Sequence, residues 1–338
     1  MQSSPAKLIF VDDELPGITR RRAGKGWSYY DPEGRLITDP REKQRLNAVG
    51  LPPAYRDAWF CPADNGHILA TGVDDKGRKQ YRYHPEFRMH RESVKFDNCS
   101  VFGNLLPLVR MRVEQDLQQR AITRERAIAS VVRLLDLGAI RVGNECYAQR
   151  NKSFGATTLR SRHAEVIGSK LRFRFKGKHG VVRDLVLNDR HLTKVVRSMQ
   201  ELPGQRLLRY LDEEQVCHDI NSSDINAYLR ETMGEDFTAK AFRTWHGSVL
   251  GFETMASAKE PITIKALTEA VAERLGNTPA VTRKSYIHPA VLSLAEQQEQ
   301  WRAGLRLPRA TKWLSREERG FLQLLQDAPN AHELLSAA

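Results

Sequence analysis

The chain has few cysteines, and they stand too far apart to form a paired motif. Among its 338 residues there are four, namely Cys61, Cys99, Cys146 and Cys217. The absence of a CxxC pair argues against a zinc ribbon and against a dithiol redox motif. Scattered thiols of this kind are typical of a reducing compartment.

Long apolar runs are also absent. No segment approaches the roughly 20 apolar residues that span a bilayer. The opening residues, MQSSPAKLIF, lack the pattern of a signal peptide. We therefore expect a cytoplasmic protein with no membrane partner.

Motifs for nucleotides and metals are missing too. The sequence contains no G-x-x-x-x-G-K-[ST] loop for nucleotide phosphates and no obvious carboxylate cluster for Mg²⁺. The prediction is a protein without a nucleotide cofactor and without a metal. There is also no internal repeat and no low-complexity segment.

Positive charge is what the chain has in excess. Lys and Arg total 53 against 41 Asp and Glu, which gives a formal net charge of +12. This balance favours a polyanionic partner, and nucleic acid is the usual one. The excess is spread along the chain, which favours a long basic binding channel over a basic tail. Charge alone does not separate this interpretation from a protein that is merely basic.

The first part of the chain, residues 20–90, is typical of β-structure. The segment GWSYYDPEGRLI predicts a hairpin with its turn at 31–34. The segment GHILATGVDDKGRKQYRYHP predicts a second hairpin with its turn at 74–77. Residues 39–48, between the two, are charged and compatible with a helix.

From about residue 90 the pattern becomes helical, with one interruption. Residues 171–187 alternate apolar and basic side chains and predict a hairpin with one face of each kind, turning at 177–180. Helices are predicted at 124–137, 189–200, 223–233, 238–252, 264–275 and 289–305, and a last one begins with a capping box at Ser315.

The predicted fold class is α+β. A small antiparallel β-rich domain is expected at residues 1–90 and a larger, mainly α-helical catalytic domain with a small β-hairpin at 91–338. The boundary between them is expected near 86–95.

The candidate chemistry centres on Tyr286. This residue follows Asn277 by nine positions, and two cations, Arg283 and Lys284, precede it. A tyrosine that attacks a phosphodiester needs cations to neutralise the phosphate, and it needs a proton donor for the leaving oxygen. A free tyrosine has a pKa of about 10, and nearby cations lower it. The competing interpretation is an aromatic core residue beside Ile287.

Further basic residues could complete such a site. Lys178 lies in a Gly-Lys-His-Gly turn, where its amine could reach a leaving oxygen. Lys240 and Arg243 are three residues apart on one predicted helix, so their side chains share a face on which a phosphate would fit. Thr238 is a plausible N-cap of that helix. Each of these cations, taken alone, is equally explained as a solvated charge.

The joint pattern resembles the type IB topoisomerase family, in its compact bacterial and poxvirus-like branch. The matching motifs are IRVGNE at 140–145, FGATTLRSRH at 154–163, FKGKHG at 175–180, KAFRTW at 240–245 and RKSYIHP at 283–289. The runs RRRAGKGW at 20–27 and GRKQYRYHP at 77–85 resemble the family's DNA-binding cap domain. The resemblance covers nearly the whole chain, and it implies the catalytic core that this family shares with the tyrosine recombinases.

The resemblance implies a role for each residue of the site. Tyr286 would be the nucleophile that forms a 3′-phosphotyrosyl bond. Arg141 and Arg243 would grip the scissile phosphate and stabilise its transition state. Lys178 would protonate the 5′-oxygen, and Lys240 would be an additional basic helper.

Asn277 is a departure from the family pattern. It would donate a hydrogen bond to a non-bridging phosphate oxygen, where many relatives have His. An amide donates but carries no charge, which leaves the size of its contribution open.

The implied reaction relaxes supercoiled duplex DNA by cutting and resealing one strand. It needs neither ATP nor metal, because each phosphodiester is exchanged for a phosphotyrosyl ester of similar energy. The expected partner is duplex DNA and the expected state is a monomer, associated with the nucleoid when bound. Contacts to DNA are implied for Arg78, Lys79, Gln80, Tyr81, Tyr83 and Tyr147, and interleaved amide, aromatic and basic groups suit that role.

Two alternatives stay open. A tyrosine site-specific recombinase has a similar segment around its nucleophile, but it usually carries His three residues before the second Arg, where this chain has Lys240. The β-rich first 90 residues also fit a topoisomerase better. A non-catalytic DNA-binding protein on the same fold would need a damaged site, whereas every candidate residue is present.

Overall fold

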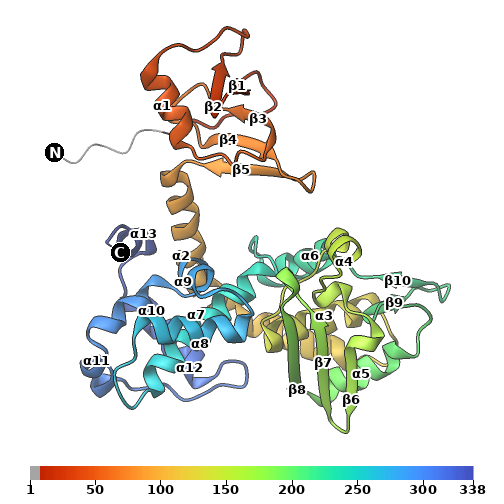
Figure 1. Cartoon of the computed structure of the whole chain (residues 1–338). Helices are drawn as coiled ribbons and strands as arrows, with labels where there is room; N and C mark the ends of the chain where they lie inside the picture. The colour runs from red at the N-terminus through yellow and green to blue at the C-terminus, as the bar shows by residue number, and fades with distance from the viewer. Residues whose placement is uncertain (1–7, 338) are drawn as a thin grey trace. The chain divides into compact units, whose positions relative to one another are not determined.

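The computed structural model describes residues 8–337 (Figure 1). The chain forms two compact units, Met1–Ser93 and Val94–Ala338. Each unit has a hydrophobic core of its own. The DNA-binding role of the first part of the chain and the catalytic role of the second stay predictions.

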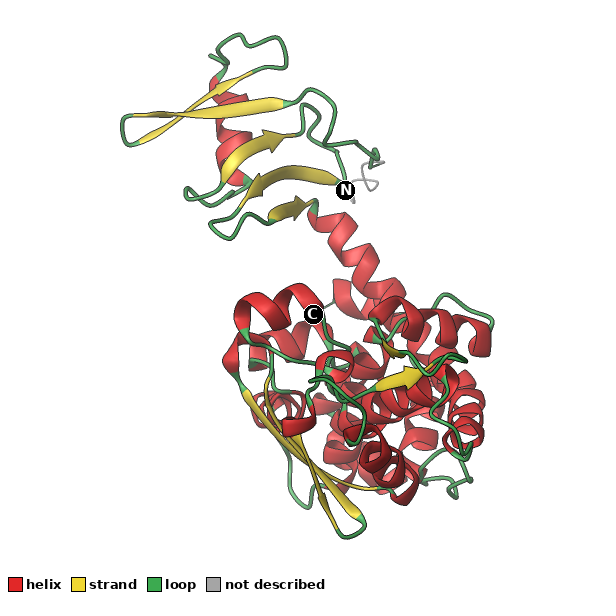
Figure 2. Ribbon diagram, turned by 90° about the vertical axis from the view of Figure 1, so that its right-hand side faces the viewer, coloured by secondary structure: helices red, strands yellow, loops and turns green. Residues whose placement is uncertain are grey.

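The first unit is a five-stranded antiparallel sheet with one helix on a face (Figure 2). Leu46 of the helix packs with Ile18, Tyr29 and Phe60 of the sheet in one buried cluster. The helix begins where the Asp39 carboxylate accepts a backbone hydrogen bond in its first turn. The elements are β1 (Ile18–Ala23), β2 (Gly26–Tyr30), α1 (Pro40–Ala48), β3 (Arg56–Phe60), β4 (Ile68–Val73) and β5 (Lys79–Tyr83), in the sheet order β2-β1-β3-β4-β5.

The second predicted hairpin of this unit is confirmed, and the first is confirmed as a tight turn whose returning arm is too short to form a strand. β4 and β5 pair around the 74–77 turn, where the Asp74 carboxylate accepts two backbone hydrogen bonds. At the 31–34 turn the Gly34 N–H donates to the Asp31 carbonyl at 2.9 Å, and a single bridge joins Tyr30 to Leu36. The other edge of β2 pairs with β1. The segment after this bridge is too short to form a strand, because Asp39, the N-cap of α1, follows Leu36 by three residues.

The second unit is mainly helical and carries two small antiparallel sheets, β6-β7-β8 and β9-β10. The predicted α+β class is thereby confirmed. Every helix within residues 8–337 is too short or too polar to span a lipid bilayer.

Helix α2 (Pro85–Leu117) begins in the first unit and continues into the second. It is followed by α3 (Arg124–Gly138), α4 (Glu145–Asn151), η1 (Ala156–Thr158), η2 (Ser161–His163), β6 (Ala164–Ile167), β7 (Lys170–Lys176), η3 (Lys178–Gly180), β8 (Val182–Asn188), α5 (Arg190–Gln200), β9 (Arg209–Leu211), β10 (Cys217–Asp219), α6 (Ser222–Met233), α7 (Lys240–Ser257), α8 (Ile264–Leu275), α9 (Pro279–Ser285), α10 (Pro289–Ser293), η4 (Leu294–Glu296), α11 (Gln298–Gly304), α12 (Arg316–Asp327) and α13 (Ala331–Ser336).

The two-faced hairpin predicted at 171–187 is confirmed as β7 and β8. Leu171, Phe173 and Phe175 are buried on one face, and α3 and α5 pack against that side of the sheet (Figure 1). Arg174 and Lys176 are exposed on the other face. The alternation of side chains along each strand produces both faces.

The helix predicted at 238–252 is confirmed, but its predicted N-cap is wrong. α7 begins at Lys240, and Ala239 before it has no side chain that can cap. The Ala239 N–H is bound instead by the Asn226 amide oxygen at 3.1 Å, from α6. A side chain distant in sequence therefore replaces Thr238 as the cap.

The helix predicted at 289–305 is interrupted. It forms α10, η4 and α11, and Gln297 between the last two has a non-helical backbone. The next side chain, Gln298, accepts a hydrogen bond from the Ile262 N–H (2.7 Å) and donates one to the Ile262 carbonyl (3.1 Å). This tertiary pairing overrides the continuous helical pattern. The helices predicted at 124–137, 189–200, 223–233 and 264–275, and the one starting at Ser315, are confirmed.

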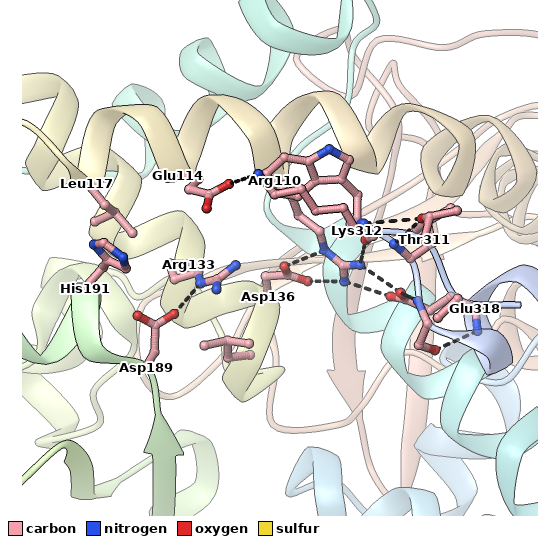
Figure 3. Close-up of a pocket in the computed structure, with 15 residues that line it drawn as sticks. Arg110, Glu114, Leu117, Arg133, Asp136, Asp189, His191, Thr311, Lys312 and Glu318 are labelled. Atoms are coloured by element: carbon pink, nitrogen blue, oxygen red, sulfur yellow. Dashed lines mark hydrogen bonds and ion pairs between the residues drawn. The ribbon is translucent and has the colours of Figure 1, made fainter.

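A network of ion pairs and hydrogen bonds links α2, α3, α7 and α12 in the second unit. Arg110 of α2 binds the carboxylates of Asp136 on α3 and Glu318 on α12, beside a cavity of about 430 Å³ (Figure 3). On α7, the Trp245 indole donates to Glu318 at 3.1 Å and His246 pairs with Asp136 at 3.0 Å. Burial would raise the pKa of the Asp136 carboxyl, but Arg110 and His246 hold that pKa well below its usual range.

Candidate active site

The predicted site residues come from segments that meet where α3 and α8 end. α3 stops at Gly138, and Ala139 takes a left-handed conformation (φ 48°) that turns the chain before Arg141. The Arg141 carbonyl then accepts the Ala156 N–H at 2.9 Å. A Cβ added at Gly155 would lie 2.5 Å from the Gly143 nitrogen, so the motifs IRVGNE and FGATT pack backbone against backbone.

Arg243 is buried on the first turn of α7 and joins two helix ends. Its guanidinium donates to the Ala139 carbonyl after α3 and to the Leu275 carbonyl at the end of α8, the latter at 3.0 Å. Its Nε is buried and has no hydrogen-bond partner within the described part of the chain. Cations suit helix C-termini because the last carbonyls carry partial negative charge.

Asn277 lies directly after α8 and meets Arg141. Its amide oxygen accepts a hydrogen bond from the Arg141 guanidinium. Its amide nitrogen is buried and, among residues 8–337, has no partner. A buried donor without a partner is costly, and a ligand oxygen would satisfy it.

Tyr286 follows the last residue of α9 and packs against α7. The Arg243 guanidinium lies 5.0 Å from the centre of the Tyr286 ring. The Tyr286 carbonyl accepts a hydrogen bond from the Ser248 hydroxyl at 3.2 Å. A Cβ added at Gly247 would lie only 2.5 Å from the same carbonyl, so this glycine permits the close approach.

The electrostatics of this cluster favour negative charge. Burial would raise the pKa of the Tyr286 phenol, but Arg243, followed by Arg141 and Lys178, outweighs it and holds that pKa below the usual value of tyrosine. Burial, with the nearby charge of Arg243, lowers the pKa of Arg141 to about 10. Burial likewise lowers the pKa of Arg183 and of Arg243.

Counter-ions are lacking around these guanidiniums. Within residues 8–337, no carboxylate forms an ion pair with Arg141, Arg183 or Arg243. Cations held together without anions repel one another, and a bound anion such as a phosphodiester would relieve that repulsion. The arrangement can therefore stabilise both a phosphate and an ionised phenol.

Three of the predicted residues in the second unit are exposed. Lys178 begins the one-turn η3 at the tip of β7–β8, and its charge still contributes to the lowered pKa of Tyr286. Lys240 is exposed on α7, and no hydrogen bond or ion pair to another described residue is recorded for its amine. Tyr147 is 44% exposed on α4, apart from the buried cluster.

The candidates for DNA contact on β5, and Arg78 just before it, already interact with other residues of the first unit. Arg78 forms an ion pair with Asp74 at 2.6 Å, and Gln80 donates to the same carboxylate at 3.1 Å. Lys79 pairs with Asp13 at 2.7 Å. The remaining two candidates, Tyr81 and Tyr83, stack with their ring centres 5.8 Å apart, and Tyr81 is exposed.

Sequence reasoning missed four residues that shape the site. Gly247 and Ser248 hold the backbone of the Tyr286 segment, as described above. Lys95 of α2 donates to the Ser285 carbonyl at 3.0 Å, one residue before the tyrosine. Arg183 of β8 donates to carbonyls at the end of α8. No local pattern marks these residues, because each acts on a segment distant in sequence.

No group of three or more His, Cys, Asp or Glu in the described range is arranged to hold a metal ion.

Comparison with known proteins gives the family. Residues 84–305 match the family model of the eukaryotic DNA topoisomerase I catalytic core, and residues 26–74 match that of the bacterial DNA topoisomerase IB N-terminal domain. The chain is 28% identical over 301 residues to the DNA topoisomerase 1B of Acanthamoeba polyphaga mimivirus, covering 85% of this chain and 90% of the relative. It is 23% identical over 236 residues to the DNA topoisomerase 1B of vaccinia virus (strain Copenhagen), covering 68% and 73%.

Among solved structures, the chain is similar to the XerH site-specific recombinase bound to palindromic difH substrate. The TM-score is 0.38 with 14% sequence identity, covering 57% of this chain and 51% of the recombinase.

The matches define an enzyme of the isomerase class that binds DNA. More particularly, the chain belongs to the type IB DNA topoisomerase family.

Proposed function

We propose that Tyr286 is the nucleophile with which this topoisomerase cuts and reseals one strand of duplex DNA. The phenol oxygen attacks phosphorus, the bond from phosphorus to the 5′-oxygen breaks, and a 3′-phosphotyrosyl ester forms. The reverse attack by the 5′-hydroxyl restores the strand and frees the tyrosine. Supercoiling torque turns the DNA between the two steps.

The observation that supports this proposal is the cluster of cations around the phenol, which has no carboxylate counter-ion among the described residues. Arg141 and Arg243 surround Tyr286 without a carboxylate to neutralise them, so a scissile phosphate would complete the charge balance. Asn277 supports the same reading, because its buried amide N–H donors lack a partner that a non-bridging phosphate oxygen would supply.

Lys178 is the proposed general acid. The departing 5′-oxygen needs a proton, and an ammonium on an exposed turn can approach it and donate one. Lys240, about one helical turn before Arg243, is the proposed additional basic helper of the site and the next candidate for the acid if Lys178 is not the acid.

The remaining proposals concern the setting of the reaction. The enzyme acts as a monomer on duplex DNA, in the cytoplasm and on the nucleoid, without nucleotide or metal. The residues that contact the duplex are Tyr147 on α4, Arg78 just before β5, and Lys79, Gln80, Tyr81 and Tyr83 on β5. The domain at 1–90 binds DNA and the domain at 91–338 performs the chemistry.

Relaxation of negatively supercoiled plasmid in excess EDTA tests the proposal. Because cations of the protein offset the phosphate charge, relaxation should persist without divalent metal. An absolute requirement for a divalent metal would contradict the mechanism.

A second experiment addresses the acid. A general acid contributes roughly 10²–10⁴ to a rate, so Lys178→Ala should slow cleavage by about that factor. A duplex with sulfur in place of the scissile 5′-oxygen should relieve the defect, because a thiolate departs without a proton. Arg243→Ala, which loses charge stabilisation instead, should show no such relief.

A further inference from the structure

Arg183 lies between the two segments that carry Lys178 and Asn277. Its side chain begins on β8, where it pairs with Phe175 of β7. Its guanidinium donates to the carbonyls of Glu273 (3.3 Å) and Arg274 (2.5 Å), in the last turn of α8. A guanidinium suits these carbonyls because they carry the negative end of the helix dipole.

The same side chain covers two glycines, and each directly precedes a proposed site residue. A Cβ at Gly276, the residue before Asn277, would lie 2.5 Å from the Arg183 Nη1 atom. A Cβ at Gly177, the residue before Lys178, would lie 3.3 Å from the Arg183 Cγ atom. Gly276 also has a positive φ of 62°, which other residues adopt with strain. The absence of a Cβ at Gly276 and at Gly177 therefore makes space for the Arg183 side chain.

The two segments differ in how firmly the rest of the fold holds them. Leu275 at the end of α8 and Ile287 just after Tyr286 are fully buried in the core. The turn residues from Lys178 to Val181 are all exposed. The turn depends on few contacts, whereas the end of α8 is held by packing.

We propose that Arg183 is a positioning residue that fastens the Lys178 turn to the end of α8, so that the general acid stands within reach of the leaving oxygen. This inference rests on the proposed function, because it assumes that Lys178 is the acid. Nη1 and Nη2 of Arg183 each donate to a carbonyl of α8, so the proposed role of the side chain is to hold the turn and not to act on the reacting atoms. It acts by limiting where the turn can move.

The test is single-turnover cleavage by the full-length Arg183→Ala variant on paired duplexes with oxygen or sulfur at the scissile 5′-position. A misplacement near 1 Å costs roughly 10²-fold in rate, so the oxygen substrate should be cut about 10²-fold more slowly. The sulfur substrate should be cut at nearly the wild-type rate, because it needs no acid. Arg183→Lys, which keeps one donor group, should lie between the two.

Arg172→Ala is the matched control. Arg172 belongs to the same hairpin, but it pairs with Asp184 at 2.7 Å on the exposed face. Its loss should leave both rates unchanged. Circular dichroism and thermal melting of each variant show whether the fold is retained.

The outcomes separate this inference from the proposed function. If Arg183→Ala slows cleavage of both substrates equally, or of neither, the positioning role is contradicted. The proposed acid is tested separately, and it is supported if the sulfur substrate relieves the defect of Lys178→Ala. A Lys178→Ala defect that sulfur leaves unrelieved contradicts the proposed acid, and the positioning role falls with it.

Discussion

Adding one methyl group at Gly247 should displace the proposed nucleophile without removing any functional group of the site. The new Cβ of Gly247→Ala would lie 2.5 Å from the Tyr286 carbonyl oxygen and 3.1 Å from the Tyr286 Cβ. The first pair must separate by about 0.9 Å to reach the 3.4 Å of an ordinary contact. The Tyr286 carbonyl oxygen belongs to the backbone, so the α7 and Tyr286 segments have to move apart as a whole.

A shift of this size predicts a rate defect. Misplacement of a reacting group by about 1 Å costs roughly 10²-fold, so cleavage by Gly247→Ala should fall by about that factor. Affinity for duplex DNA should change little, because the cations that contact phosphates remain. The helix gains up to about 1 kcal/mol from replacing glycine with alanine, which offsets part of the strain in a thermal melt.

Gly251→Ala provides the control on the same helix. Its Cβ would meet the Ile287 and Val291 methyl groups at 3.3 and 3.4 Å, contacts that flexible side chains can accommodate. This variant gains the same helix propensity and should cleave at nearly the wild-type rate. The two rates are compared by trapping the covalent adduct on a labelled duplex over time. Equal rates for the two variants would refute the argument that Gly247 sets the position of Tyr286.

Three further predictions address the surroundings of the site. Burial lowers the pKa of His288 to about 4 from 6.5, so between these pH values the unfolded state binds a proton that the folded state does not. The free energy of unfolding should therefore fall by about 3 kcal/mol as pH drops from about 6.5 to 4. His288→Asn, which keeps an N-cap, should flatten that part of a plot of stability against pH, and an unchanged plot would contradict the assignment to His288. Asn277→Asp should slow cleavage by about 10²–10³-fold, as loss of an oxyanion donor does, whereas Asn277→His should retain most of the rate. Equal rates for the two variants would contradict the proposal that Asn277 donates a hydrogen bond to the phosphate. Glu318→Gln breaks a buried ion pair with Arg110 and should cost about 3–5 kcal/mol in chemical denaturation, and a cost below 1 kcal/mol would show that the network is dispensable.

Much of the fold follows from local signals in the sequence. The alternation of Leu171, Phe173 and Phe175 with basic residues predicts both faces of β7, and the capping box at Ser315 predicts the start of α12. These signals are reliable because neighbouring residues determine them. The 124–137 helix is predicted for the same reason, since its apolar face repeats with the helical period.

Other features depend on partners that the sequence does not reveal. Asn226 caps α7 in place of Thr238, and Gln298 interrupts the helix predicted at 289–305 by binding the backbone of Ile262. Both contacts join segments separated by more than ten residues. Periodicity and capping rules describe one segment at a time, so they cannot anticipate such pairings.

The candidate site shows the same division. The motifs predict Tyr286, Arg141 and Arg243 as site residues, and the structure brings these three side chains together. They do not identify Gly247 or Arg183, whose importance comes from what lies against them in space. The free positive charge of the 78–83 segment is also overestimated from sequence, because Asp74 and Asp13 bind the side chains of Arg78, Lys79 and Gln80.

Identification of the residue joined to DNA tests the central claim most directly. The wild-type enzyme is mixed with a labelled duplex, the covalent adduct is trapped with denaturant, and the modified peptide is mapped by mass spectrometry. The 3′-phosphate should be attached to Tyr286, and Tyr286→Phe should form no adduct while binding the duplex nearly as well. Attachment to any other residue, or an adduct formed by Tyr286→Phe, would contradict the assignment.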